Sequence, residues 1–325
     1  MPTELPLAKA AYFTAIDGVA SFPEVMTAIR NAIADPGATP TSVGRAVERD
    51  VAFASRLLRI VNAPAVGLIR PCASVPHAVA LVGLARIGMH AEKVASLAAL
   101  SQCAAIAPDV TKRAAVEAAV ARSIAAEVGV SPEQAFTASL LADIGVIAII
   151  AAQPKWRTDT ISCADEKVRL GFDYAELGAD VLVRWHLPSP IPEVVRLHHD
   201  LEAAKASTTE VARYVAILQA AEYLAPGVDC NDEPNVEEWE LIASHPALEL
   251  LGIDAVRLAR LWPELVKGIE EESRTTTAPS AVTEHEEERS PQARAPKKSR
   301  KAFYFAMAAA VAIPAAVGFE LFFRR

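Results

Sequence analysis

Helix-start signals recur along this chain, and they constrain its fold more than any other feature. Serine, threonine or aspartate repeatedly stands just before a proline or an acidic first turn, as N-caps and capping boxes require. Apolar residues then follow three and four positions apart, as on one face of a helix. The clearest starts are at Ser21, Thr39, Asp50, Ser74, Ser131, Asp173 and Ser207. Alternating patterns typical of strands do not occur, so the sequence predicts an all-α fold.

For three segments the sequence makes specific predictions about where a helix ends or which face it buries. The helix that Asp50 caps should bury one apolar face made of Phe53, Leu57 and Ile60. The helix that starts at Ser131 should run on to Asp143. The unbroken apolar run at residues 146–152 is rich in alanine, which favours a buried helix end over a strand.

Composition limits the class of protein and the partners it can have. The chain has 325 residues, of which 52% are hydrophobic, enough for a substantial core in one or two domains. Its formal net charge of −8 gives no broad positive field, so we expect no nucleic-acid partner. The four cysteines are scattered and form no CxxC pair, which favours a reduced compartment and packing roles.

The C-terminal part of the chain changes character twice. Residues 270–301 are rich in charged and small polar side chains, which predicts a disordered linker. Residues 302–323 are almost uncharged, and as a helix they would span roughly 30 Å, the thickness of a bilayer core. We therefore predict a transmembrane tail anchor, with a helix docked on the body or lying in the interface as the alternative. Basic residues flank it on both sides: Lys297, Lys298, Arg300, Lys301, Arg324 and Arg325.

Several short motifs between Phe22 and Tyr223 follow one family pattern. The N-terminal ones are Asp35-Pro36, Arg56 to Asn62 followed by Gly67, and Ser74 to Leu84. The C-terminal ones are Leu140 to Gly145, Leu170 to Ala179, Trp185 to Pro188 and His198-His199-Asp200. Together they resemble the HDOD family, the HD-related output domains of bacterial signalling proteins. The resemblance implies a helical N-terminal lobe at residues 1–105 and an HD-like helical core at residues 106–269.

The same resemblance directs attention to a metal site that active HD enzymes build from histidines and aspartates. Here Ala142 precedes Asp143 where the family's His-Asp pair would stand, and Tyr174 stands at another histidine position. The helix predicted from Asp109 to Glu127 contains no histidine. The residual HD-site positions are Asp143, His198, His199 and Glu222. We expect no metal or other cofactor, because divalent metals need several converging ligands.

Two interpretations of these residual positions stay open. Asp143, His198 and His199 could form a 2-His-1-carboxylate iron site, and the chain would then be a divergent HD-type metal-dependent phosphohydrolase. The favoured interpretation is a hydrogen-bond network without catalysis, in which His198 or His199 donates to a buried Asp143.

The sequence thus predicts a regulatory module rather than an enzyme. We expect it to bind a partner protein or a small signalling ligand at the cytoplasmic face of a bacterial inner membrane. Arg56, Arg59 and Arg70 could recognise a phosphate-bearing ligand, although Glu48 and Asp50 nearby favour ordinary pairing along the helix face.

Overall fold

The computed structural model describes residues 9–17, 23–89, 108–153, 163–229 and 233–274. Within these ranges the structure is helical and contains no strand, so the predicted all-α class is confirmed. The predicted linker at residues 270–301 lies almost wholly outside the described residues. The predicted anchor at residues 302–323 and its flanking basic residues lie outside them entirely.

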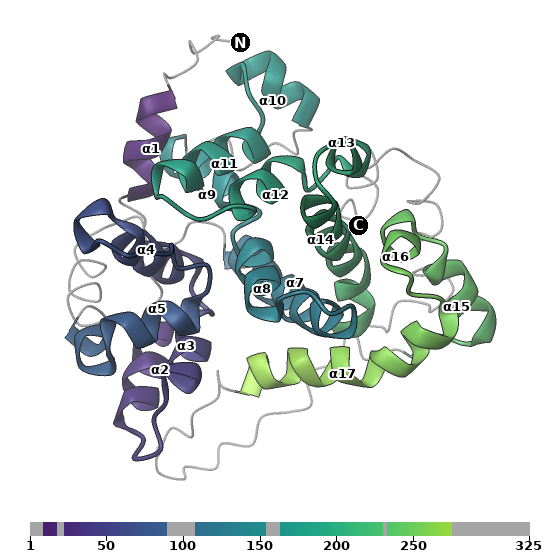
Figure 1. Cartoon of the computed structure of the whole chain (residues 1–325), viewed down its shortest axis with the longest axis horizontal. Coiled ribbons are helices and arrows are strands. Elements are labelled where there is room, and N and C mark those ends of the chain that lie inside the picture. Colours follow the sequence, from purple (N-terminus) through teal and green to yellow (C-terminus); the bar gives the residue numbers. More distant parts are fainter. Residues whose placement is uncertain (1–8, 18–22, 90–107, 154–162, 230–232, 275–325) are drawn as a thin grey trace, which may run out of the picture.

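The N-terminal lobe is built from short helices that start where the sequence predicted. Thr39 forms a capping box with Ser42, and the carboxylate of Asp50 accepts a hydrogen bond from the backbone N–H of Phe53 at 2.8 Å. Its elements are α2 (Pro23–Ala34), α3 (Pro40–Val47), α4 (Val51–Asn62), the 3-10 helix η1 (Pro64–Val66) and α5 (Val75–Val82). Helix α3 packs between α2 and α5, and α4 packs on α5 (Figure 1).

Ile60 corrects the predicted apolar face of α4. Phe53 and Leu57 are buried as predicted, whereas the Ile60 side chain is 38% exposed. The centre of the buried face is formed by Ala54, Leu57, Leu58 and Val61. These four residues follow the i, i+3, i+4, i+7 spacing of one helix face, and Ile60 falls outside that face. The end of α4 therefore leaves a large apolar side chain in contact with solvent.

The second group of helices is arranged around α7 (Pro108–Glu127), which packs against α8 (Pro132–Leu140), α14 (Thr209–Asp229) and α17 (Ala255–Arg274). In Figure 1, α7 and α8 lie at the centre and α17 runs beneath them. The remaining helices of this group are α9 (Ile144–Ala152), α10 (Cys163–Leu170), α11 (Tyr174–Arg184), α12 (Ile191–Leu197), α13 (Leu201–Ala206), α15 (Val236–Ala243) and α16 (Pro246–Leu251). This core builds the candidate site.

Asp143 lies between two helices rather than inside one. Helix α8 ends at Leu140 and α9 starts at Ile144, so the aspartate stands at their junction. The stretch Pro132–Ala152 is the one part of the described chain that is long and apolar enough to cross a membrane. Of its most apolar window, 72% is buried inside the protein, so the core accounts for its hydrophobicity.

Helix α9 approaches α11 closely because Gly145 has no side chain. A Cβ added at Gly145 would lie 1.9 Å from the carbonyl oxygen of Tyr174 and 2.9 Å from the backbone nitrogen of Gly178. This contact sets the position of the first turn of α11, which carries Tyr174 into the candidate site.

The first helix, α1 (Lys9–Asp17), packs on α9 of the core, although its sequence position falls in the predicted N-terminal lobe. Tyr12 is fully buried, accepts a hydrogen bond from Gln153 at 2.6 Å and lies edge-on to Phe172. The predicted boundary between residues 105 and 106 lies outside the described residues and stays a prediction.

Charged side chains join the lobe to the core. Glu48, the C-cap residue of α3, is fully buried and accepts from Arg45 at 3.1 Å and from Arg122 of α7 at 2.8 Å. Glu133 of α8 accepts from the same two guanidinium groups, at 3.1 and 3.3 Å. The four side chains form a closed ring across the lobe boundary. Helix-face pairing of Glu48 and Asp50 with Arg56, Arg59 and Arg70 was also predicted. Asp50 does interact electrostatically with Arg56, whereas Arg59 pairs with Asp17 of α1.

Candidate functional site

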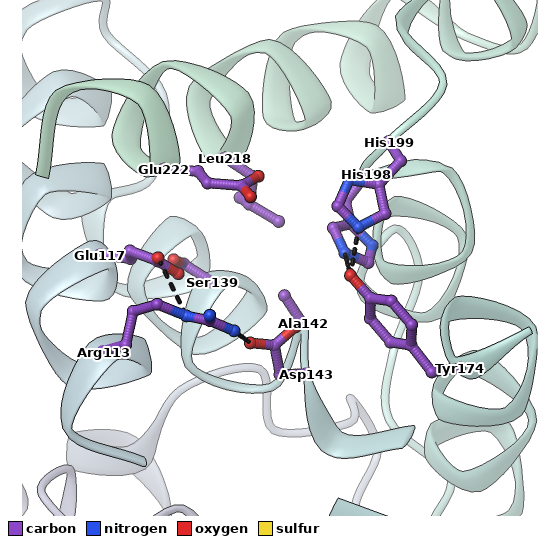
Figure 2. A pocket seen from close by; sticks show the side chains of 10 residues that line it. All are labelled: Arg113, Glu117, Ser139, Ala142, Asp143, Tyr174, His198, His199, Leu218 and Glu222. Carbon is purple, nitrogen blue, oxygen red and sulfur yellow. Dashed lines mark hydrogen bonds and ion pairs between the residues drawn. The ribbon is translucent and has the colours of Figure 1, made fainter. Parts of the chain in front are cut away.

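A small polar cavity lies where α7, α8, α11, α12 and α14 meet (Figure 2). Its volume is about 20 Å³, which is room for about one water molecule. The four residual positions predicted from the sequence all line this cavity. The full lining is Arg113, Glu117, Ser139, Ala142, Asp143, Tyr174, His198, His199, Leu218 and Glu222.

Arg113 and Asp143 form the central ion pair of the cavity. The Nη2 atom of Arg113 donates to Oδ2 of Asp143 at 2.6 Å, and its Nε atom lies 3.4 Å from Oε1 of Glu117. Arg113 and Glu117 stand one turn apart on α7, so both reach the junction at Asp143 (Figure 2). The Asp143 side chain is 12% exposed and that of Arg113 is 33% exposed.

The ion pair controls the charge of Asp143. Burial alone would raise the pKa of its carboxyl, but Arg113, with smaller effects from His198 and His199, lowers that pKa below its ordinary value. The donor predicted for Asp143 was His198 or His199, and this is wrong. The donor is the guanidinium of Arg113 on α7, the helix that contains no histidine.

The two histidines are bound to other partners. His198 is buried, and its Nδ1–H donates to the carbonyl oxygen of Val195 at 2.6 Å. In a neutral ring this leaves Nε2 as an acceptor. The Tyr174 hydroxyl lies 3.2 Å from that Nε2 and also hydrogen-bonds Nε2 of His199, as Figure 2 shows. One phenol thus joins both imidazoles.

Burial favours the neutral form of both imidazoles. Burial, together with the adjacent His199, lowers the pKa of His198 to about 4. Burial also lowers the pKa of His199, although Asp143 and Asp173 oppose the shift. Tyr174 keeps its proton because burial and the nearby acids raise the pKa of its phenol well above the ordinary value.

Two further carboxyl groups face the cavity from α7 and α14. Burial, Glu222 and Asp143 raise the pKa of Glu117 well above its ordinary value, although Arg113 opposes the shift. Burial also raises the pKa of Glu222, against the effect of His198. One guanidinium cannot neutralise three buried carboxylates, so these two groups hold their protons more firmly than exposed glutamates do.

The residues present do not fit the divalent metal of HD enzymes. The Asp143 carboxylate faces a guanidinium, both imidazole Nε2 atoms are engaged by Tyr174, and Ala142 offers no ligand. Across the described ranges, no group of three or more His, Cys, Asp or Glu side chains is arranged to hold a metal ion. A cavity of about 20 Å³ is also far below the roughly 300–1,000 Å³ of pockets that take organic ligands.

Sequence reasoning missed two structural features of this cavity. Arg113 was not considered, although its one-turn spacing from Glu117 within an alanine-rich helix was a usable signal. Tyr174 was noted only as the loss of a histidine, whereas its hydroxyl joins the two histidines that are present. The roles predicted for Asp143, His198, His199 and Glu222 stay predictions; their convergence on one cavity is a structural fact.

Comparison with known proteins agrees with the fold and with the motifs. The family model of the HDOD domain matches residues 19–201. The chain belongs to the HDOD family. A search of curated proteins finds an uncharacterized protein of Treponema pallidum (strain Nichols), 25% identical over 203 residues. That match covers 58% of this chain and 39% of the Treponema protein, so the HDOD chain spans well under half of its relative.

Solved structures share the fold over most of this HDOD chain. The MmoQ response regulator of Methylococcus capsulatus is 27% identical, with a TM-score of 0.59 over 76% of this chain and 98% of MmoQ. A virulence factor from Campylobacter jejuni has a TM-score of 0.58 over 80% of this chain and 96% of its own. Its identity is 14%, so it shows the fold alone.

Proposed function

We propose that this HDOD protein is a non-enzymatic signalling module that binds a partner protein or a small signalling ligand. In this proposal the cavity around Asp143 is the remnant of an HD metal site, and its present role is to hold the core helices together. Recognition would take place on the outer surfaces of the helices.

The observation that carries the proposal is the ion pair between Arg113 and Asp143. HD-type hydrolysis needs a metal ion that activates water. Here a fixed guanidinium supplies positive charge to the aspartate, and it cannot bind or activate a water as a Lewis acid does. The surrounding space, about 20 Å³, is too small for a nucleotide or a phosphate ester beside the pair.

The signalling role draws support from one structural relative. MmoQ, which shares 27% identity with this chain over a matching fold, is a response regulator. A role that depends on contacts suits a chain whose Asp143 cavity, at about 20 Å³, has no room for an organic substrate.

We further propose that residues 302–323 anchor the module in the bacterial inner membrane, with the helical body on the cytoplasmic side and residues 270–301 as a disordered linker. The proposal rests on the length and apolar composition of that segment and on its basic flanks. An anchor would raise the local concentration of the module near membrane-bound partners without any new contact.

Hydrolysis assays on the full-length protein test the proposal. Cyclic dinucleotides and nucleotide phosphates are offered with Mg²⁺, Mn²⁺ or Fe²⁺, and product release is measured for the wild type and for Asp143→Asn. The control variant is Glu264→Gln, which changes an exposed carboxylate on α17. We expect all three proteins to release product at the uncatalysed rate. Metal-dependent turnover in the wild type and in Glu264→Gln that disappears in Asp143→Asn would establish a phosphohydrolase.

A further inference from the structure

The segment that follows α4 presents apolar side chains to solvent. Ile69 is 100% exposed and Val66 is 51% exposed, next to Ile60 at 38%. Every residue from Pro64 to Pro71 is exposed except Leu68, which is half-buried. We call residues 60–71 the apolar loop. Large aliphatic side chains this exposed, grouped within a short segment, mark contact surfaces more often than scattered single ones do.

The apolar loop is held open by its own base. The buried Asn62 side chain donates from Nδ2 to the carbonyl oxygen of Cys72 at 2.9 Å and accepts from the Cys72 N–H at 2.7 Å. Gly67 turns the chain in the left-handed region, at φ 68°, and a Cβ added there would meet nothing within 4 Å. The two ends are thus tied together while the middle projects from the lobe. Leu68 packs against the core, and Val66 and Ile69 on either side of it stay in solvent.

The stretch of sequence that contains the apolar loop is basic, in contrast to the chain as a whole. No aspartate or glutamate occurs between Asp50 and Glu92, whereas Arg56, Arg59, Arg70 and Arg86 do. The net charge of the whole chain is −8. Arg70 is exposed and directly follows Ile69.

Two acidic residues contact α4, the helix that leads into the apolar loop, and neither is an exposed, unpaired charge. Asp17 of α1 is paired with Arg59. Asp50 is 1% exposed and caps α4. The exposed part of the loop, residues 64–71, therefore carries Arg70 beside Ile69 and contains no acidic residue.

We propose that the apolar loop docks onto an anionic lipid bilayer, with Ile69 and Val66 entering the boundary between headgroups and acyl chains and Arg70 contacting lipid phosphates. Basic side chains next to aliphatic ones are the combination that interfacial binding uses. A projecting apolar tip can bind either a preformed pocket or a surface that deforms around it. A lipid bilayer deforms, so it does not need a shape that matches the loop. The docking is separate from the proposed tail anchor and would orient the N-terminal lobe towards the membrane.

Hydrogen–deuterium exchange on the full-length protein tests this locally, whether or not the tail is inserted. Uptake at residues 63–71 is compared on phosphatidylcholine vesicles and on vesicles of phosphatidylcholine with phosphatidylglycerol at a 7:3 ratio. We expect exchange in the apolar loop to slow by roughly tenfold on the anionic vesicles. Ile69→Asp and Arg70→Glu should each abolish this slowing. Val256→Asp, at a site on α17 that is 75% exposed, serves as the matched control and should retain it.

Three results would overturn the proposal. Equal uptake on both kinds of vesicle, at the fast rate of an open loop, would mean that the loop does not touch lipid. Slow uptake on both that anionic lipid does not change would mean that another part of this chain, or a second copy, covers the loop. Anionic-specific slowing that survives Ile69→Asp and Arg70→Glu would place the contact elsewhere. None of these results bears on hydrolysis, so the proposal can fail while the proposed function stands.

Discussion

Replacing Arg113 by glutamine removes the positive charge that the buried Asp143 faces. Breaking a fully buried pair costs about 3–5 kcal/mol, because the partner is left as an uncompensated charge. Exposed pairs contribute only about 0.2–1 kcal/mol. The Asp143 side chain is 12% exposed and that of Arg113 is 33% exposed, so this pair lies between the two cases. We expect Arg113→Gln to lower the free energy of unfolding at pH 7 by about 2 kcal/mol.

The loss should depend on pH in a defined direction. Asp143 has a pKa below its ordinary value of 3.8 in the folded protein, so the stability it contributes is present above that ordinary value. That contribution is lost as the pH falls through the lowered folded value. The difference between the wild type and Arg113→Gln should therefore shrink in strongly acidic solution.

Urea denaturation followed by circular dichroism measures this difference, and Arg196→Gln is the control. Arg196 pairs with Asp180 at 2.8 Å, and the two side chains are 40% and 31% exposed. The control should lose less than about 1 kcal/mol. A double-mutant cycle with Asp143→Asn should show coupling, since the two residues share one interaction. If Arg113→Gln costs no more than Arg196→Gln and shows no coupling to Asp143, the ion pair does not organise the cavity.

Three further predictions follow from the packing, the charges and the tail. Gly145→Ala should lower the melting temperature through roughly 1–3 kcal/mol of overpacking, because its Cβ would lie 1.9 Å from the Tyr174 carbonyl oxygen. The control is Gly88→Ala, whose Cβ would lie 3.7 Å from its nearest neighbour and should not lower the melting temperature. Equal effects of the two substitutions would refute the close approach of α9 to α11. Glu117→Gln should stabilise the protein at pH 8 by about 1 kcal/mol and leave its stability unchanged at pH 4. The pKa of Glu117 is raised in the folded protein, so ionising this carboxyl at high pH costs stability, and glutamine does not ionise. Destabilisation in thermal melts at pH 8 would contradict this prediction. The full-length chain should stay with membranes through carbonate and high-salt washes, whereas a chain ending at Ser290 should not; release of the full-length chain by salt alone would indicate an interfacial helix instead.

Much of the helical framework could be predicted because its signals are local. Thr39 and Asp50 cap the helices they were expected to cap, since an N-cap bonds to backbone only two or three residues away. Ile60 was placed wrongly because periodicity fixes the spacing of a buried face but not which residues its edges include.

The candidate site was predictable only in part, for a physical reason. Family motifs identified Asp143 and His198, which do line one cavity. The partner of Asp143 could not be predicted in the same way, because Arg113 lies 30 residues away on another helix. Which long side chain reaches a buried carboxylate depends on how two helices cross, and the spacing of residues within each helix does not determine that.

Binding of Mn²⁺ to the full-length protein, followed by the electron paramagnetic resonance of the free ion, tests the central claim most directly. The claim is that Arg113, rather than a metal ion, neutralises Asp143. It predicts that the wild type and Asp143→Asn bind Mn²⁺ equally weakly and without defined stoichiometry at neutral pH. One tightly held ion per wild-type chain, absent in Asp143→Asn and present in Glu264→Gln, would contradict the claim.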